Sequence, residues 1–401
     1  MKFKHISGGI TAVPGFLASG VHAGLKKEKL DMAVIYNPKQ CSAAGVFTTN
    51  VVKAAPLLLT MDRLAKGYSH GVVVNAGNAN ACNGPNGMED AKAMASAAAK
   101  ELGIDEEQML VSSTGVIGEP MPMDIVLPGV IKATKELSKD GGQAAAEAIM
   151  TTDLVLKESA VKLQLAGKTV TIGGLAKGSG MIHPNMATML GFIATDAVIG
   201  PETLKKALKE VVDSTYNMIT VDGDTSTNDS VVMLASGDAG NTSIEHGTEE
   251  YNVFLQGLTE VCTKLAQDIA KDGEGATTLL EVVVKNAPTI IDARKAAKAV
   301  VGSNLFKCAV YGRDANWGRI LCAVGYSGAQ FNPNEVDIYI GELQVAENGG
   351  ALPFDEEKAS AILGKDKVTV TVDLKTGDHS ATAWGCDLTY KYVEINGSYR
   401  T

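Results

Sequence analysis

One segment of this chain combines a nucleophile with small residues that let the backbone bend around it. It reads Lys177-Gly-Ser-Gly-Met-Ile-His-Pro-Asn-Met-Ala187-Thr188-Met-Leu190. The hydroxyl of a threonine can attack the carbonyl that precedes it, and hydrolysis of the resulting ester leaves a new N-terminus that carries both nucleophile and amine. The bond between Ala187 and Thr188 could therefore cleave itself. A plain glycine-rich loop is the alternative, because cleavage also needs a polarised and strained peptide that the sequence does not show.

A second segment, residues 112–118, suits the stabilisation of negative charge. It follows a predicted strand and places the hydroxyl of Thr114 beside Gly115, whose N–H no side chain covers. Donors of this kind can hold the oxyanion that develops during acyl transfer. A simple turn after the strand is the alternative.

Two segments with carboxylates also suit a polar site. Residues 222–229 resemble a calcium loop superficially, but they lack the glycine and glutamate spacing of an EF-hand, so we expect a polar loop near a site. Residues 271–278 place Glu274 between two glycines, where the backbone can approach a ligand and the acid can pair with an ammonium group. A capped turn is the alternative for this second segment.

Three further segments leave two interpretations open. Residues 75–84, rich in asparagine and alanine, suit either the wall of a polar pocket or a series of Asx turns. Residues 311–319 contain two arginines that suit either a clamp for a carboxylate or an ion-paired surface loop. The tail, residues 394–401, can contribute to function only if it is held against the rest of the chain.

The composition is typical of a globular protein that acts on small molecules. The chain has 401 residues, 45% of them apolar, which is enough for about two to three domains with sizeable cores. Its formal net charge of −10 disfavours nucleic acid and anionic membranes as partners. No apolar run reaches the ~20 residues of a membrane span, and residues 1–9 lack the apolar core of a signal peptide. We expect a cytoplasmic protein.

Neither the cysteines nor the histidines form a pattern that binds metal. The six cysteines are scattered without a CxxC pair, which makes a disulfide framework or a zinc site improbable. No two of the six histidines have the i, i+4 spacing that places two imidazoles on one helical face. We expect reduced thiols and no metal.

The residue pattern predicts a mixed α/β fold in which sheets lie under helices in layers. Runs rich in Val, Ile, Thr and Leu predict strands over residues 72–75, 109–112, 169–172, 231–235, 280–284, 336–340, 368–372 and 388–393. Amphipathic spacing predicts helices over residues 89–102, 204–216, 252–271 and 292–301. The last two predicted strands follow each other closely, so we expect mainly antiparallel sheet near the C-terminus. Residues 177–188 interrupt the pattern and predict an exposed boundary near the middle of the chain.

Several of these segments together resemble the ornithine acetyltransferase family of arginine biosynthesis. The resemblance rests on residues 177–190, Ser113-Thr-Gly115, Gly312-Arg-Asp-Ala-Asn-Trp-Gly318 and Asn396-Gly-Ser-Tyr-Arg-Thr401, which follow the family's order over nearly the whole chain. It implies a layered α/β sandwich of mainly antiparallel sheet and helices, of the self-cleaving N-terminal-nucleophile type.

The family resemblance also implies how the chain is processed and what it catalyses. The precursor would be cleaved into an α chain, residues 1–187, and a β chain, residues 188–401, which assemble as an α2β2 heterotetramer. Thr188 would be the nucleophile that takes an acetyl group from N-acetylornithine and passes it to glutamate. Its freed α-amine would act as the base, and Lys177, if close to that amine, would lower its pKa through like-charge repulsion.

The same resemblance assigns roles to other residues. Thr114 and Gly115 would hold the oxyanion. The substrates would contact Thr151, Lys177, Thr188, Glu274, Asn396 and Thr401, with Thr152 as the alternative to Thr151. No cofactor is expected. Some members of the family also use acetyl-CoA as acetyl donor, and the sequence does not decide whether this chain does.

Two other functions compete with acetyl transfer. A self-cleaving fold with an N-terminal nucleophile can also act as an aminopeptidase or amidase, if water rather than an amine reaches the acyl-enzyme. A non-catalytic amino-acid-binding protein, in which the glycine-rich loop only surrounds a ligand, would keep its chain intact.

Overall fold

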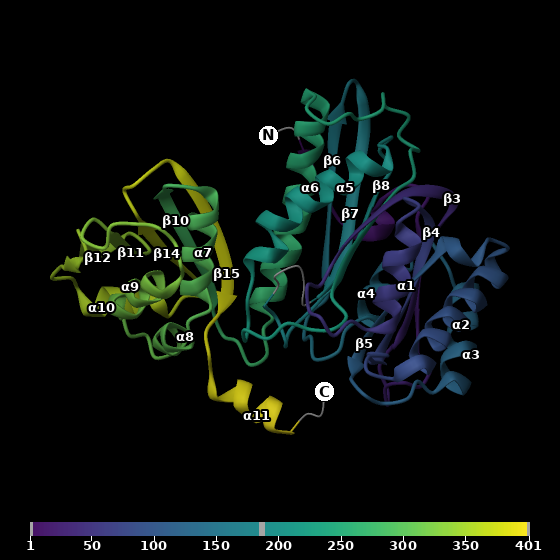
Figure 1. Ribbon diagram of the computed structural model, residues 1–401, viewed down its shortest axis with the longest axis horizontal. Coiled ribbons are helices and arrows are strands. Elements are labelled where there is room, and N and C mark those ends of the chain that lie inside the picture. The colour runs from purple at the N-terminus through teal and green to yellow at the C-terminus, as the bar shows by residue number, and fades with distance from the viewer. Residues whose placement is uncertain (1–2, 184–188, 399–401) are drawn as a thin grey trace.

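The computed structural model describes residues 3–183 and 189–398, which form two β-sheets flanked by helices (Figure 1). The strands are β1 (Phe3–Ile6), β2 (Leu17–Val21), β3 (Met32–Phe47), β4 (Tyr68–Asn78), β5 (Met109–Val116), β6 (Lys157–Leu165), β7 (Lys168–Lys177), β8 (Leu190–Thr195), β9 (Ser230–Ala235), β10 (Leu279–Ala287), β11 (Asp337–Ile340), β12 (Leu343–Glu347), β13 (Gly350–Ala351), β14 (Lys367–Asp373) and β15 (His379–Cys386). The α-helices are α1 (Ala55–Leu64), α2 (Gly84–Leu102), α3 (Met123–Lys135), α4 (Gly142–Ala148), α5 (Pro201–Ser214), α6 (Glu249–Lys271), α7 (Ile290–Val301), α8 (Asn304–Tyr311), α9 (Trp317–Tyr326), α10 (Glu356–Leu363) and α11 (Tyr390–Ser398). Within the described part of the chain, no helix has both the length and the apolar character that crossing a membrane requires.

The larger sheet depends on one long strand, β3. The strand order is β1-β6-β7-β8-β9-β3-β4-β5, and β2 also pairs with β3. Residues 32–36 of β3 pair with β2 and β4, whereas residues 42–47 pair with β9. The register with β4 shifts between Tyr36 and Cys41. This irregularity divides the sheet into a first leaf, made of β2, β4, β5 and the start of β3, and a second leaf, made of β1, β6–β9 and the end of β3.

A buried cluster of apolar side chains joins the two leaves. Val72 and Val74 of β4 contribute to it, as do Phe192 of β8 and Val232 of β9. Val73, between the two β4 valines, belongs instead to a cluster with α1, α2 and α3. Successive side chains of a strand point to opposite faces, so each leaf has one face toward this interior and one toward helices.

Helices cover the outer face of each leaf. α1, α2 and α3 pack on the first leaf, whereas α5 and α6 pack on the second (Figure 1). α6 is amphipathic over its 23 residues and buries Leu258, Leu265 and Ile269 in the core cluster on this side. The layers therefore run helix, sheet, sheet, helix. The predicted layered sandwich of mainly antiparallel sheet is confirmed, since only β4–β5 and β8–β9 pair in parallel in this sheet.

The second sheet, with order β13-β12-β11-β14-β10-β15, is built from the C-terminal part of the chain. Only β10 and β14 pair in parallel in it, so the predicted antiparallel character is confirmed. β14 and β15 are not neighbours, however, because β10 lies between them. α7 packs on β10 and β15.

Most predicted elements are present, with one exception near the C-terminus. The strands predicted between residues 72 and 372 and the four predicted helices are confirmed. The strand predicted over residues 388–393 is wrong, because α11 begins at Tyr390. The hydroxyl of Thr389 accepts the N–H of Lys391 at 3.1 Å and so caps the first turn of this helix.

The predicted boundary around residues 177–188 lies inside the first sheet. β7 and β8, on either side of it, are antiparallel neighbours. The segments 1–187 and 188–401 therefore share one sheet and are not separately folded bodies; their division into two chains stays a prediction. Gly178 and Ser179 are buried, so the expected exposure is wrong for this described part of the connection.

The contact between α4 and β2 leaves no room for a side chain at Gly20, where a Cβ atom would lie 1.9 Å from the carbonyl oxygen of Ala144. We expect Gly20→Ala to lower the free energy of unfolding by at least about 1–3 kcal/mol, because backbone must move apart. Urea unfolding followed by circular dichroism measures the change. Gly325→Ala in α9, where the Cβ would meet open space, is the control and should be neutral or stabilise by ~0.5–1 kcal/mol. Equal destabilisation of both variants would contradict the predicted clash.

Candidate active site

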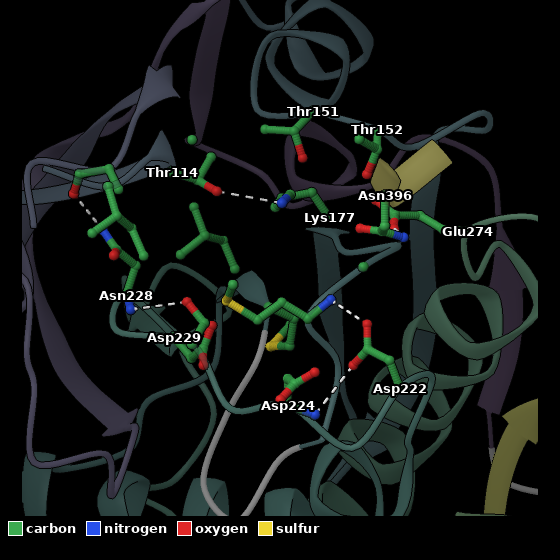
Figure 2. A pocket seen from close by; sticks show the side chains of 18 of the residues that line it. Thr114, Thr151, Thr152, Lys177, Asp222, Asp224, Asn228, Asp229, Glu274 and Asn396 are labelled. Atoms are coloured by element: carbon green, nitrogen blue, oxygen red, sulfur yellow. Dashed lines mark hydrogen bonds between the residues drawn. The ribbon is translucent and has the colours of Figure 1, made fainter. Parts of the chain in front are cut away.

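Polar residues from distant parts of the chain line a cavity of about 280 Å³ (Figure 2). The described residues that the sequence analysis assigned to the site all line it: Thr114, Gly115, Thr151, Lys177, Glu274 and Asn396. Thr152 lines it beside Thr151, so both candidates remain. Ala187, Thr188 and Thr401 lie outside the described residues.

The end of β5 brings Thr114 and Gly115 to this pocket. Gly115 has a φ angle of 135°, and a Cβ atom there would lie 2.3 Å from the carbonyl carbon of Gly77 in β4. Only glycine fits such a conformation at such a distance. The side-chain amide of Asn228 donates to the carbonyl of Ser113 at 2.8 Å. The backbone that carries Thr114 is therefore held by a neighbouring strand and by a side chain.

Lys177, at the end of β7, is a buried cation of the pocket. Its Nζ donates to Oγ1 of Thr114 at 3.3 Å (Figure 2). Burial lowers the pKa of Lys177, and the negative charge of Asp153 opposes this effect. Because the oxygen of Thr114 accepts this hydrogen bond, the hydroxyl hydrogen of Thr114 is available to another acceptor in the pocket.

A second buried lysine, Lys157, bridges the carboxylates of Asp153 and Asp272. Nζ of Lys157 donates to Oδ1 of Asp153 at 2.7 Å and to Oδ2 of Asp272 at 2.6 Å. The side chains of Lys157 and Asp153 are fully buried. Burial by itself raises the pKa of Asp153, but the charges of Lys177 and Lys157 and the hydrogen bonds to its carboxylate hold that pKa well below its usual range. Asp153 is therefore ionised.

The two carboxylates also bind backbone N–H groups of the pocket walls. Asp153 accepts from Gly178 at 2.7 Å and from Thr151 at 3.0 Å. Asp272, at the end of α6, accepts from Leu154 at 3.0 Å. The three charged side chains thus fix the end of β7 and the turn that carries Thr151. No local signal predicts this set, because Asp272 lies 115 residues from Lys157, although Asp153 and Lys157 are only four residues apart.

Close backbone approach places Glu274 in the pocket, as the flanking glycines predicted. A Cβ atom on Gly180 would lie 2.4 Å from the carboxyl carbon of Glu274, and one on Gly275 would lie 2.7 Å from the backbone nitrogen of Tyr392. Glu274 is buried, and its Oε2 accepts from Nδ2 of Asn396 at 2.7 Å. The C-terminal helix α11 therefore contacts the site.

The loop over residues 222–229 contributes further polar groups to the pocket, as expected. Asp222, Asp224 and Asp229 all line it (Figure 2). Asp222 accepts the backbone N–H groups of Met181 and Ile182 at 2.6 and 2.8 Å. The loop is therefore attached to the chain that leaves β7.

The two other segments that the sequence singled out differ in their relation to the pocket. Residues 75–84 contribute Ala79 to its lining, and they also contain an Asx turn, in which the side-chain oxygen of Asn78 accepts the backbone N–H of Asn80 at 2.8 Å. The segment is therefore both a part of the pocket wall and a turn. Residues 311–319 connect α8 and α9, and none of them lines this cavity, so they do not form a carboxylate clamp in this pocket. Arg319 donates to the backbone carbonyl of Leu305 at 2.7 Å, so the ion pairing expected of a surface loop stays a prediction. Across residues 3–183 and 189–398, no three side chains of the types His, Cys, Asp or Glu are grouped so that they could hold a metal ion.

We expect Lys157→Met to destabilise the protein by about 3–5 kcal/mol, because it leaves two carboxylates without their buried cation. Chemical unfolding with guanidinium chloride measures the loss. Lys209→Met is the matched control, since Lys209 also pairs with an aspartate four residues away, Asp213, but its side chain is 63% exposed. That variant should lose less than ~0.5 kcal/mol. Similar losses in both variants would show that the buried network does not stabilise the fold.

Comparison with known proteins identifies the family. Residues 17–401 match the ArgJ family. A relative from Symbiobacterium thermophilum, named arginine biosynthesis bifunctional protein ArgJ, is 56% identical over 399 residues, which are 99% of each chain. A relative of the same name from Caldanaerobacter subterraneus subsp. tengcongensis is 55% identical over 400 residues, again 99% of each chain. The crystal structure of ArgJ from Bacillus halodurans is 48% identical, with a TM-score of 0.52, over 53% of this chain and 100% of that chain. The chain therefore belongs to the ArgJ family, the ornithine acetyltransferases of arginine biosynthesis that its motifs predicted.

Proposed function

We propose that the chain cleaves itself between Ala187 and Thr188, and that the freed Thr188 carries an acetyl group from N2-acetylornithine to glutamate. One observation carries this proposal: the residues expected to bind substrate and oxyanion surround the same cavity as Met189 and Leu190, which directly follow Thr188. An acyl transfer needs its nucleophile, oxyanion donors and substrate contacts within a few ångströms of one another.

The position of the Ala187–Thr188 bond in the chain supports cleavage. Lys177 and Leu190 pair across β7 and β8, so both ends of the segment that contains this bond are at the pocket. The Bacillus halodurans chain aligns along its whole length with 53% of this chain, about 213 residues. Residues 188–401 number 214. A separate chain of this length is what cleavage before Thr188 would produce.

The first half of the reaction would form an acetyl ester. The α-amine of Thr188, whose unperturbed pKa of ~7.7–8 leaves part of it uncharged near neutrality, takes the hydroxyl proton. The hydroxyl oxygen attacks the acetyl carbonyl, the bond between that carbon and the α-nitrogen of ornithine breaks, and the nitrogen leaves with the proton. In the second half, the amine of glutamate attacks the ester, and Thr188 regains its proton as N-acetylglutamate leaves.

Thr114 and Gly115 would stabilise the oxyanion in both halves. Lys177 donates to the Thr114 oxygen, which leaves the Thr114 hydroxyl hydrogen for the developing negative charge. The buried charge of Lys177 also raises the positive potential at this end of the cavity.

The charged groups of the pocket match an amino-acid substrate. Lys177 can pair with a substrate carboxylate. Glu274 and Asn396 can bind an ammonium group, or the amide N–H that replaces it in an acetylated substrate. Thr151 or Thr152 and Thr401 would complete the contacts. Because acetylornithine and glutamate share an α-amino-acid frame, one pocket can accept them in turn.

The remaining parts of the proposal concern the second acetyl donor and the assembly. The relatives are named bifunctional, which supports acetyl-CoA as an additional acetyl donor for glutamate. We propose no other cofactor. The α and β chains would remain together in an α2β2 heterotetramer, as the motif resemblance implies. We also propose a cytoplasmic location.

Cleavage is tested by denaturing electrophoresis and N-terminal sequencing of the purified protein. We expect two fragments, one of which begins at Thr188, and a single intact band for Thr188→Ala, since that variant lacks the attacking hydroxyl. An active wild-type preparation that contains only the intact chain would refute the proposal.

The oxyanion role is tested at Thr114 by steady-state assay of acetyl transfer from N-acetylornithine to glutamate. Thr114→Ala removes the hydroxyl and should lower kcat by about 10²-fold or more. Thr114→Ser keeps a hydroxyl and should retain most of the activity. If Thr114→Ala has the wild-type kcat, the hydroxyl does not stabilise the transition state.

A further inference from the structure

The C-terminal helix α11 contacts the pocket without burying any side chain. Tyr390 is 83% exposed and Val393 is 69% exposed, and no residue of α11 belongs to a core cluster. Apolar burial, the usual source of helix stability in a protein, therefore does not hold α11 in place. Hydrogen bonds, a ring contact between Tyr390 and Tyr311 and the close approach of Gly275 to the backbone of Tyr392 hold it instead.

Three hydrogen bonds connect α11 and its cap to the rest of the site. Thr389, the capping residue, donates to the carbonyl of Gly275 at 2.7 Å. Oη of Tyr392 donates to Oδ2 of Asp222 at 3.3 Å, and Nδ2 of Asn396 donates to Glu274 at 2.7 Å. The first of these bonds fixes only the start of the helix. The other two connect the helix itself to carboxylates that line the cavity.

Asp222 connects more than the helix. Its carboxylate accepts backbone N–H groups from Met181, Ile182 and Asp224 in addition to the hydroxyl of Tyr392. One carboxylate thus joins the chain that follows β7, the acidic loop and α11. A group with so many donors has a fixed orientation, which makes it a firm acceptor for Tyr392.

Tyr392 and Asn396 lie one helical turn apart on α11. Nδ2 of Asn396 also donates to the backbone carbonyl of Tyr392, at 3.1 Å. Both side chains line the cavity. Fixing the ring of Tyr392 therefore fixes the position from which Asn396 reaches Glu274 and the ligand space.

We propose that Tyr392 is a positioning residue for substrate binding: its hydrogen bond to Asp222 holds α11 so that Asn396 and Glu274 face the amino-acid substrate. This inference rests on the proposed function, in which Asn396 and Glu274 contact the substrates. Burial and the nearby charge of Asp222 raise the pKa of Tyr392, so its hydroxyl stays protonated and remains a donor at neutral pH. The role concerns binding of both substrates and leaves the chemistry at Thr188 unchanged.

The test compares Tyr392→Phe with Tyr390→Phe, a matched control on the same helix whose side chain is 83% exposed. We expect Tyr392→Phe to be cleaved like the wild type and to keep its kcat within about two-fold, while KM for both N-acetylornithine and glutamate rises about 5- to 20-fold, as loss of one hydrogen bond to a carboxylate implies. Tyr390→Phe should have wild-type constants. Unchanged KM values in Tyr392→Phe would overturn the inference.

A double-mutant cycle with Asn396→Ala separates positioning from general destabilisation. If Tyr392 acts through Asn396, the double variant should have nearly the KM of Asn396→Ala alone, whereas independent effects would multiply. Multiplying effects would overturn the inference and leave the proposed function intact. Wild-type KM values in Asn396→Ala would instead refute the substrate contact of Asn396, on which the inference and this part of the proposed function depend.

Discussion

The ammonium group of Lys157 lies between Asp153 and Asp272, and the walls of the pocket meet around this contact. Removing a charged group from water costs several kcal/mol, so these side chains are tolerated only as a set. Lys177 adds a second positive charge that acts on Asp153. The carboxylates then use their remaining oxygen lone pairs on backbone N–H groups of the pocket walls. The same buried ion pairs therefore stabilise the fold and hold the backbone of the site.

Close packing of backbone imposes the second constraint. The end of β5 reaches the pocket only because Gly115 lies against Gly77, and Glu274 reaches it only because Gly180 has no side chain. Each contact brings a polar group from one segment against the backbone of another. The glycine-rich composition therefore serves the site directly, and these glycines would be difficult to replace even though they carry no chemical group.

Much of the fold could be predicted because most of its elements have local signals. The amphipathic pattern of α6 and the β-branched run of β14 need no information from distant residues. Residues 388–393 show where local patterns fail: their apolar residues suit a strand, but Thr389 caps a helix and no neighbouring strand is available. Residues 311–319 show the same limit for function. Two arginines near glycines are compatible with a carboxylate clamp, and only their position beside the second sheet, outside the cavity, excludes them from this pocket.

The sequence by itself determined the family and the reaction class, and it named six residues that line the pocket, because ordered motifs such as 177–190 combine several residue types that rarely occur together. The tertiary structure decided which of those residues meet and what supports them. Lys157 and Asp272 are 115 residues apart and Tyr392 and Asp222 are 170 apart, so no local pattern relates them. Such pairs form only when the sheets and α11 have packed, since a charge or hydroxyl finds its partner through three-dimensional proximity and not through spacing along the chain.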